Sequence, residues 1–312
     1  MKGLYVPGAV IIGNIGSNSG GSADLSDIDL TLSSLDPRLS YQCVSHHAYY
    51  AADGTIQFAE PDVWPLEYRN GLVVGRHDPE PQRTNLFTYS DNLSATPWIR
   101  NGDVVDVTKS GPPAPYGTAA FAVEVGEQVN SGVFIRSPMV AGEVYTISLA
   151  GHADDVRTML IGDSYLGYQS VRVNFNQRTS TLSSPFVYRF SDVNDEWVRY
   201  AVSGAATNSG TPGFIIYSAE ALAGTYSAAM IQHEAGAFVT SPIITEGTSA
   251  TRAAAFASVK NPGGLATSIR VTYSDSTTVN IDFPAGGADV QLPQSAVDWG
   301  TRYIQRIEYL KS

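Results

Sequence analysis

Residues 268–283 read SIRVTYSDSTTVNIDF, and this stretch decides the fold class. Apolar and polar side chains alternate through residues 268–273 and again through residues 278–283. A period of two places one side of an extended segment against a core and the other side in water. Serine, aspartate and threonine, which favour turns and loops, separate the two runs. The stretch therefore predicts two β-strands joined by a turn.

The same alternation recurs in short runs along the rest of the chain, at residues 104–108, 121–125, 144–149 and 171–175. Turn residues separate such runs at intervals of roughly 8–12 residues, the spacing typical of a sandwich or barrel. Apolar residues at helical spacing are nearly absent. We therefore expect an all-β protein.

The composition excludes several classes of protein. Charged residues make up 16% of the 312 residues, whereas about 25% is usual in soluble proteins. The 19 Lys and Arg against 30 Asp and Glu leave a net charge of −11, so nucleic acid is not an expected partner, because binding phosphates needs clustered positive charge. The single cysteine, Cys43, excludes a disulfide framework and a thiolate zinc site. We expect Cys43 to be a small buried hydrophobic residue.

The N-terminal residues offer no membrane span. The apolar stretch at residues 4–12 contains Pro7 and Gly8 and is shorter than the roughly 20 residues that a spanning helix needs. Membrane insertion is therefore not expected. A Gly-, Ser- and Asn-rich stretch at residues 13–22 has the composition of a flexible linker.

Two composition changes divide the chain into three segments. A polar, Pro-rich stretch occupies residues 77–81, and a Thr-, Ser- and Ala-rich connector occupies residues 247–257. We expect boundaries there, which give segments 1–81, 82–255 and 256–312. The middle segment holds the densest strand pattern and most of the aromatic residues.

The middle segment also carries a series of motifs in a fixed order. It opens QRTNLFTYSD at residues 82–91, with PWI at 97–99, and resembles the opening QRTNLLTYSEDFSNAAW of bacteriophage tail and virion proteins. Further similar motifs follow in the order of that family: GEVYTISL at 142–149, VNFN at 173–176, EWVRY at 196–200, IQHEAGAFVTSPI at 231–243 and ATRAA at 250–254. The flanks resemble the same proteins, with LDPRLS at 35–40, ADG at 52–54, TSIRVTYSD at 267–275 and DWGTRYI at 298–304.

This resemblance implies an architecture and a function. Residues 82–255 would form a jelly-roll β-sandwich of the carbohydrate-binding type, and residues 256–312 a small C-terminal β-domain. Residues 1–81 would be an attachment and oligomerisation region that docks onto the virion, although residues 1–30 match nothing in the family pattern. The protein would be a tail-fibre or spike component, or an adhesin, presented to the host surface. It would be assembled in the host cytoplasm and located in the virion.

The resemblance also implies partners. Other virion proteins and a host surface glycan are the expected ones, and a homo-oligomer, first of all a trimer, is expected from fibre-like relatives. The apolar residues 4–12 are predicted to pair with another chain, so that deletion of residues 1–20 abolishes assembly and leaves the jelly roll folded. Two alternatives stay open: a capsid or tail decoration protein with no ligand, and a polysaccharide-degrading tail enzyme.

Aromatic residues supply the candidate ligand-binding site. Exposed Tyr or Trp faces stack on sugar rings, and neighbouring polar side chains bind the hydroxyls. Asp163, Tyr165 and Tyr168 lie in one polar, loop-like stretch and are the predicted sugar contacts. Trp98 and Tyr116 are further aromatic candidates.

The other tryptophans have structural interpretations. Trp197 lies in a strand motif whose aromatic residue is usually buried, so we assign it to the core. Trp64 and Trp299 are expected to pack within their own small domains.

No catalytic residues, metal ligands or cofactors are predicted. The carboxylate groups at Asp154–Asp155 and at Asp192, Asp195 and Glu196 lie in turn-like sequence, and adjacent strand residues point to opposite faces. A glycosidase needs two carboxylates that face one sugar bond. A structural calcium ion at these carboxylates is a minor alternative. The five histidines lack metal-ligand spacing and are expected at the surface or in local hydrogen bonds.

Overall fold

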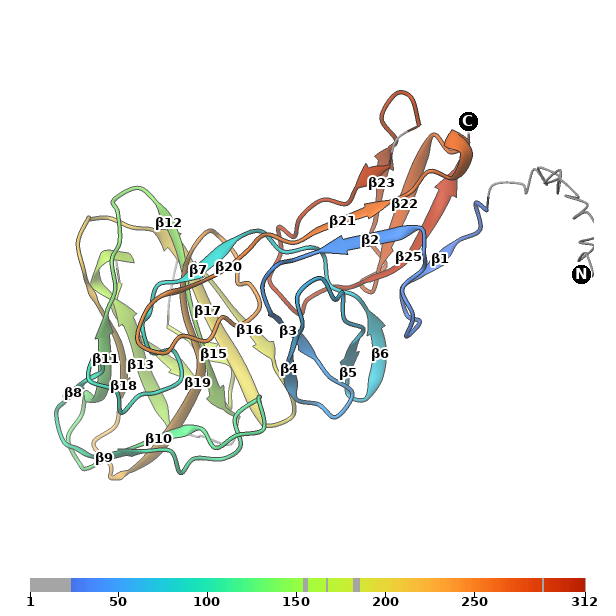
Figure 1. Ribbon diagram of the computed structural model, residues 1–312. Coiled ribbons are helices and arrows are strands. Elements are labelled where there is room, and N and C mark those ends of the chain that lie inside the picture. Colours follow the sequence, from blue (N-terminus) through green and yellow to red (C-terminus); the bar gives the residue numbers. More distant parts are fainter. Residues whose placement is uncertain (1–23, 154–156, 167, 182–185, 288, 312) are drawn as a thin grey trace, which may run out of the picture.

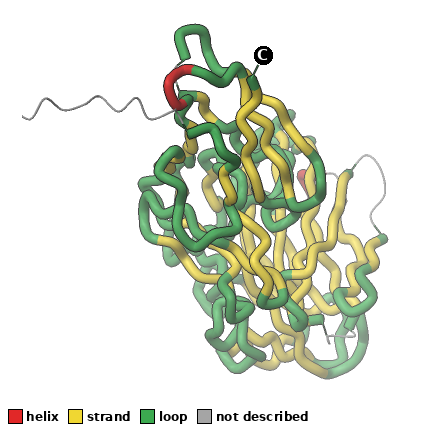
Figure 2. The backbone as a smooth tube through the Cα atoms, turned by 90° about the vertical axis from the view of Figure 1, so that its right-hand side faces the viewer, coloured by secondary structure: helices red, strands yellow, loops and turns green. Residues whose placement is uncertain are grey.

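A computed structural model shows a protein whose regular secondary structure is almost wholly antiparallel strands, joined by long loops (Figures 1 and 2). The structure describes residues 24–153, 157–166, 168–181, 186–287 and 289–311. Within these ranges the helical elements are two single 3-10 turns, η1 (Ser164–Leu166) and η2 (Pro262–Gly264), and no helix is long and apolar enough to cross a bilayer. The all-β prediction is confirmed. The predictions for residues 4–12 and 13–22 lie outside the described residues.

The larger part of the molecule is a sandwich of two six-stranded sheets. One sheet has the order β16 (Val187–Asp192), β17 (Trp197–Ala205), β12 (Val144–His152), β19 (Gly224–Ala235), β10 (Phe121–Val125), β9 (Val104–Thr108). The other has the order β15 (Thr179–Ser180), β14 (Tyr168–Asn174), β13 (Thr158–Asp163), β18 (Gly213–Ser218), β11 (Ser131–Arg136), β8 (Ile99–Asn101). The alternating runs expected at 104–108 and 121–125 coincide with β9 and β10.

The order of these strands is that of a jelly roll. The chain changes sheet when it passes from β10 to β11, and again when it passes from β12 to β13. Two later strands, β18 and β19, are then inserted into the two sheets. As a result β19 lies between β10 and β12, and β18 lies between β11 and β13. Two interleaved Greek keys of this kind define the jelly-roll sandwich.

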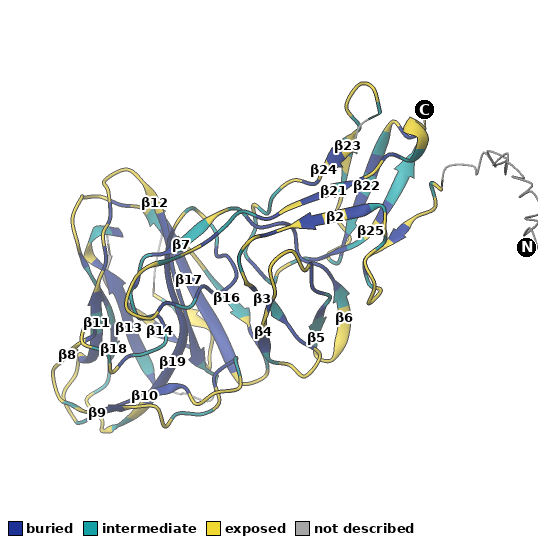
Figure 3. Cartoon of the chain, viewed as in Figure 1, coloured by how far each residue is buried: buried dark blue, intermediate teal, exposed yellow. Residues whose placement is uncertain are grey.

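Side chains from both sheets fill the space between them. The core includes Val123 and Ile147 from one sheet and Ile161 and Phe214 from the other, and all four are fully buried. Trp197 is also fully buried, as predicted, on the outer face of its sheet. The central strands of the sandwich, such as β12 and β17, are drawn mostly dark in Figure 3.

A smaller module lies beside the sandwich and combines both ends of the described chain. One of its sheets has the order β1 (Ile28–Asp29), β25 (Ile304–Leu310), β22 (Ser268–Tyr273), β23 (Thr278–Asp282), and another has the order β2 (Leu39–Gln42), β21 (Phe256–Val259), β24 (Val290–Gln291). Two hairpins complete it: β3 (His47–Tyr50) with β4 (Ile56–Ala59), and β5 (Glu67–Arg69) with β6 (Leu72–Gly75). A short ladder of β7 (Arg83–Asn85) and β20 (Ala250–Arg252) leads into and out of the sandwich.

The first and third segments expected from the sequence share sheets and a core in this module. Ile28 pairs with Ile307, and Leu39 pairs with Val259. Buried residues from both segments form one apolar cluster, which includes Cys43, confirmed here as a buried residue. The two segments therefore fold together, although more than 170 residues separate them in the chain.

The smaller module packs on the outer face of the β12-containing sheet. We call the apolar contact the docking cluster; it joins Tyr50 and Trp299 of the smaller module to Ala150, Trp197 and Ala229 of the sandwich. The Tyr50 and Trp299 rings stack with centroids 4.3 Å apart. The expectation that Trp299 packs within its own small domain was wrong, because Trp299 contributes to a contact between all three segments. This cover explains why β12 is buried on both faces.

The polar stretch expected as a segment boundary is buried in the same region. Residues 76–80, which we call the buried linker, carry charge on both sides of the proline; all five are buried, and the four ionisable residues are at most 4% exposed. Each ionic side chain meets a partner from another part of the fold. His77 contacts Glu67, Asp78 pairs with Arg302 at 2.9 Å, and Glu80 pairs with Arg252 at 3.1 Å. The linker thus connects the hairpins, the C-terminal strands and the sandwich.

Candidate functional site

The two small hairpins bring an open group of tyrosine and amide side chains together. In β3 the alternation of a strand turns Tyr50 into the docking cluster and leaves Tyr49 half-buried on the other face. Gln57 of β4 lies directly opposite Tyr49 in the register of the hairpin. Tyr68, half-buried on β5, comes from the second hairpin. The site therefore depends on how the two hairpins sit beside each other.

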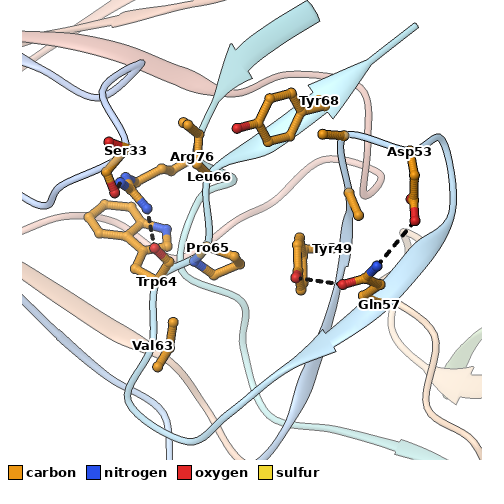
Figure 4. Close-up of a pocket in the computed structure, with 12 residues that line it drawn as sticks. Ser33, Tyr49, Asp53, Gln57, Val63, Trp64, Pro65, Leu66, Tyr68 and Arg76 are labelled. Atoms are coloured by element: carbon orange, nitrogen blue, oxygen red, sulfur yellow. Dashed lines mark hydrogen bonds between the residues drawn. The ribbon is translucent and has the colours of Figure 1, made fainter. Parts of the chain in front are cut away.

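These side chains line a hollow of about 540 Å³, which we call the tyrosine pocket. Figure 4 shows Tyr49, Tyr68 and Pro65 around the hollow, with the Gln57 amide between Tyr49 and Asp53. The Tyr49 hydroxyl donates a hydrogen bond to Gln57 Oε1 at 3.0 Å, and Gln57 Nε2 donates to Asp53 Oδ2 at 3.4 Å. The volume falls within the roughly 300–1,000 Å³ typical of small-molecule sites.

The turn between β3 and β4 keeps the pocket's carboxylate charged. Asp53 accepts hydrogen bonds from the Thr55 hydroxyl at 2.7 Å and the Thr55 backbone N–H at 3.0 Å. These bonds hold the pKa of the Asp53 carboxyl below its usual value. Burial raises the pKa of Tyr49, so its hydroxyl stays protonated at neutral pH. The pocket thus offers one ionised acceptor beside the neutral hydroxyl of Tyr49 and the amide of Gln57.

A buried network behind the pocket holds the hairpins in place. Glu67 Oε2 accepts a hydrogen bond from the Tyr50 backbone N–H at 3.0 Å, which links β5 to β3. The same carboxylate contacts His77 Nδ1; burial alone lowers the pKa of His77, but Glu67 raises it above its ordinary value. The Trp64 indole donates to the His77 carbonyl at 3.0 Å. The pocket walls are therefore set before any ligand arrives, which reduces the entropy lost on binding.

This arrangement is suited to binding a polar ring compound. Tyrosine faces stack on the apolar side of a sugar, while an amide and a carboxylate bind its hydroxyls. Asp53 is the one acidic side chain among the 12 lining residues, whereas hydrolysis of a glycosidic bond ordinarily uses two. In the part of the chain that the structure describes, no three His, Cys, Asp or Glu side chains lie close enough to hold a metal ion.

The sugar contacts predicted from the sequence lie in a different part of the molecule, at the end of β13. Asp163 is only 1% exposed, and its Oδ1 accepts hydrogen bonds from the backbone N–H groups of Tyr165 at 2.8 Å and Leu166 at 3.3 Å. Burial raises the pKa of Asp163 to about 6. Tyr165 is half-buried and packs against the sandwich core. Tyr168 begins β14, and its side chain lies outside the described residues. The ligand role of the three stays a prediction.

The other aromatic candidates are less open than the tyrosine pocket. Trp98 is 5% exposed and donates its indole N–H to the Tyr89 carbonyl at 2.8 Å. Tyr116 packs against the docking cluster. Trp64 stacks on Tyr41 of its own segment, in a core that the first and third segments share.

The carboxylates and histidines weighed in the sequence also have definite places. Asp192 pairs with Arg178, and Asp154–Asp155 lie outside the described residues. The histidines are expected at the surface or in local hydrogen bonds, and the surface alternative is wrong for His47, His77 and His233, which are at most 3% exposed. Their side chains hydrogen-bond to Tyr41, Glu67 and Ser137, respectively. Their imidazole rings are accommodated by aromatic neighbours, and burial lowers the pKa of His47 to about 3.

Sequence reasoning missed the tyrosine pocket, although part of its signal was present. The Ala-Asp-Gly sequence at residues 52–54 is typical of a turn, and a hairpin closed at Asp53 pairs residue 49 with residue 57. That pairing would have placed Tyr49 beside Gln57. The contribution of Tyr68 had no local signal, because it depends on the contact between two separate hairpins.

No protein-family model matches this chain, and no curated protein matches it closely. The candidate site therefore rests on its own geometry.

Proposed function

We propose that this chain is a bacteriophage virion protein, as a tail-fibre or spike component, that binds a host surface glycan without cleaving it. The sequence motifs from residue 82 to residue 254 support the virion part of this proposal. The tyrosine pocket supports the glycan part, and it is the observation that carries it. A jelly-roll sandwich beside it provides a rigid support, since binding sites held on a rigid scaffold keep their geometry.

The geometry also favours binding over hydrolysis. Two tyrosine rings, an amide and one carboxylate give stacking surface and hydroxyl partners. An inverting or retaining glycosidase would place a second carboxyl group across the sugar bond. In this pocket the place opposite Asp53 is taken by Trp64, Pro65 and Arg76, and the Arg76 guanidinium already donates to the Leu32 carbonyl at 2.9 Å.

The test of glycan binding is a glycan array of bacterial surface polysaccharides, probed with the full-length protein and with single variants. Tyr49→Ala and Tyr68→Ala should each weaken binding about tenfold, which corresponds to ~1.4 kcal/mol. Tyr217→Ala is the matched control, because Tyr217 is a half-buried tyrosine on β18, away from the pocket. Tyr165→Ala tests the site predicted from the sequence.

Each outcome of the array is decisive. Loss of binding in the two pocket variants alone supports the proposal. Loss in Tyr165→Ala alone would move the site to the end of β13. Silence across the whole array would overturn the glycan function and favour a decoration protein with no ligand. Loss of viscosity of a polysaccharide solution would overturn the non-enzymatic part.

The virion part is tested by counting copies in purified particles. Three or six copies at the tail agree with a fibre or spike, whereas hundreds over the shell would assign the chain to capsid decoration. Absence from intact particles would overturn the virion proposal.

A further inference from the structure

The tyrosine pocket continues into two further hollows toward the sandwich. A second hollow, of about 230 Å³, shares Asp53 and Tyr68 with the pocket. A third, of about 460 Å³, shares Arg69, Asn70 and Asp195 with the second. Neighbouring hollows share lining residues, so the three lie next to one another in a row, which we call the groove. It runs from the hairpins to the turn between β16 and β17.

The dimensions of the groove suit a chain rather than a single ring. The two end hollows, of about 540 and 460 Å³, each fall within the roughly 300–1,000 Å³ of a small-molecule site. The hollow between them is less than half as large as the tyrosine pocket. Two roomy ends joined by a narrower passage match a ligand with repeated rings and slender linkages.

The two walls of the groove are fixed to each other. Arg69, the last residue of β5, donates to the Val193 carbonyl of the sandwich at 2.9 Å and to the Gly300 carbonyl at 3.1 Å. Its guanidinium carbon lies 3.6 Å from the centre of the Tyr50 ring. This residue therefore holds the hairpin against the sandwich at the point where the hollows meet. A groove with fixed walls needs little rearrangement to accept an extended ligand.

The charges along the groove favour an uncharged ligand. Three acids and three bases line it, so their formal charges cancel: Asp53, Asp192, Asp195, Arg69, Arg76 and Arg178. Each arginine already has a protein partner. Arg69 donates to the Val193 carbonyl and Arg76 to the Leu32 carbonyl. Arg178 donates to the Asp192 carboxylate. An acidic polymer would therefore meet occupied cations and exposed carboxylates, and like charges oppose binding.

The sandwich end of the groove has polar groups suited to hydroxyls. Asn70 and Asp195 are both exposed. Among the described residues, neither side chain has a hydrogen bond or an ion pair. Both face a hollow that the tyrosine pocket reaches through the passage, so a ligand held at Tyr49 and Tyr68 can extend to them.

We infer that the groove binds an extended, uncharged oligosaccharide segment of a surface polysaccharide. One sugar ring lies against Tyr49 and Tyr68, and a later unit of the same chain meets Asn70 and Asp195. The inference rests on the proposed glycan-binding function and adds the length and charge class of the ligand.

Calorimetric titration of the full-length protein tests this inference. The probes are fragments of two and six sugar units cut from the neutral polysaccharide that binds best on the array. The six-unit fragment should bind about tenfold more tightly than the two-unit fragment. Asn70→Ala and Asp195→Ala should weaken binding of the six-unit fragment by about fivefold or more and leave the two-unit fragment unchanged. Asp289→Ala, at an exposed aspartate of the smaller module, is the matched control.

The outcomes separate this inference from the function on which it rests. If both fragments bind equally and Tyr49→Ala still abolishes binding, glycan binding at the tyrosine pocket is supported and binding of an extended chain along the groove is overturned. If Tyr49→Ala changes neither titration, the pocket itself is wrong. A hexamer of galacturonate that binds more tightly than the neutral six-unit fragment would overturn the uncharged class.

Discussion

The buried carboxyl group of Asp163 contributes a pH-dependent part of the folding stability. Its pKa is raised from 3.8 to about 6 because burial disfavours the charged form. The folded state therefore binds a proton more tightly than the unfolded chain does, and stability is lost as the pH rises through this interval. At 1.36 kcal/mol per pKa unit, the free energy of unfolding falls by roughly 3 kcal/mol between a pH below 4 and a pH above 6.

Asp163→Asn should remove this contribution. The Asn side-chain oxygen can still accept the backbone hydrogen bonds of Tyr165 and Leu166, but it does not ionise. Urea unfolding of both proteins between pH 4 and pH 7 should show that the variant gains stability relative to the wild type as the pH rises. Parallel curves for the two proteins would show that Asp163 does not titrate in this way.

The buried pair of Glu80 and Arg252 provides a second prediction at the residue scale. The Glu80 carboxylate also accepts hydrogen bonds from the Ser241 backbone N–H at 2.7 Å and hydroxyl at 2.6 Å. Arg252→Met leaves this buried carboxylate without its cation, and we expect a loss of about 3–5 kcal/mol in the free energy of unfolding. Arg100→Met, which breaks an exposed pair with Asp106, should cost less than about 1 kcal/mol. Equal losses in denaturant titrations would contradict the assignment.

At the scale of elements, one glycine allows β6 to meet β25. Gly75 has a φ of +119°, and a Cβ there would lie 2.3 Å from the Ile304 carbonyl oxygen. The next residue, Arg76, donates its backbone N–H to that same oxygen at 3.1 Å and accepts from Ile304 N–H at 2.7 Å. A side chain at residue 75 would push the β5–β6 hairpin away from the C-terminal strand.

Gly75→Ala is therefore expected to destabilise the fold more than an alanine at a comparable glycine. Gly54 is the matched control, because its φ is +83° and nothing lies within 4 Å of the added Cβ. Both variants place a Cβ on a backbone with positive φ, which is strained, but only Gly75→Ala also adds a steric clash. Its free energy of unfolding should therefore fall by about 1–3 kcal/mol more than that of Gly54→Ala. Chemical denaturation measures the difference. A smaller loss for Gly75→Ala than for Gly54→Ala would show that the hairpin moves freely.

The strands that sequence could predict are those with local alternation. Residues 268–273 form β22 with Ile269, Val271 and Tyr273 buried and the intervening residues half-exposed, as a period of two requires. The pairing of β1 with β25 had no such signal, because it joins residues far apart in the chain. The site shows the same division: the Tyr49–Gln57 pair follows from a local turn, whereas the position of Tyr68 depends on packing.

The buried linker shows why charged residues beside prolines were a poor guide to exposure in this sequence. His77, Asp78 and Glu80 beside prolines are typical of an exposed connection. Their partners, Glu67, Arg302 and Arg252, are scattered along the sequence, so the compensation becomes visible only in the folded chain. Buried charges with distant partners cannot be distinguished from solvated ones by composition.

At the scale of the whole molecule, the smaller module depends on both ends of the described chain. Removal of residues 256–312 takes away the partners of β1 and β2 and part of their core. We expect residues 24–81 to lose protection in hydrogen exchange measured by mass spectrometry. The strands of the sandwich should keep theirs, because their ladders lie between residues 99 and 235. Retained protection in residues 24–81 would contradict a shared core.

The pairing of β1 with β25 also has a mechanical meaning. Both strands lie at the pole of the molecule opposite the sandwich (Figure 1). A pull between the tyrosine pocket and either of these strands would pass through the hairpins, the buried linker and the β22–β25 sheet. The jelly roll would lie outside the load path, so its core would stay unstrained while the smaller module bears the force.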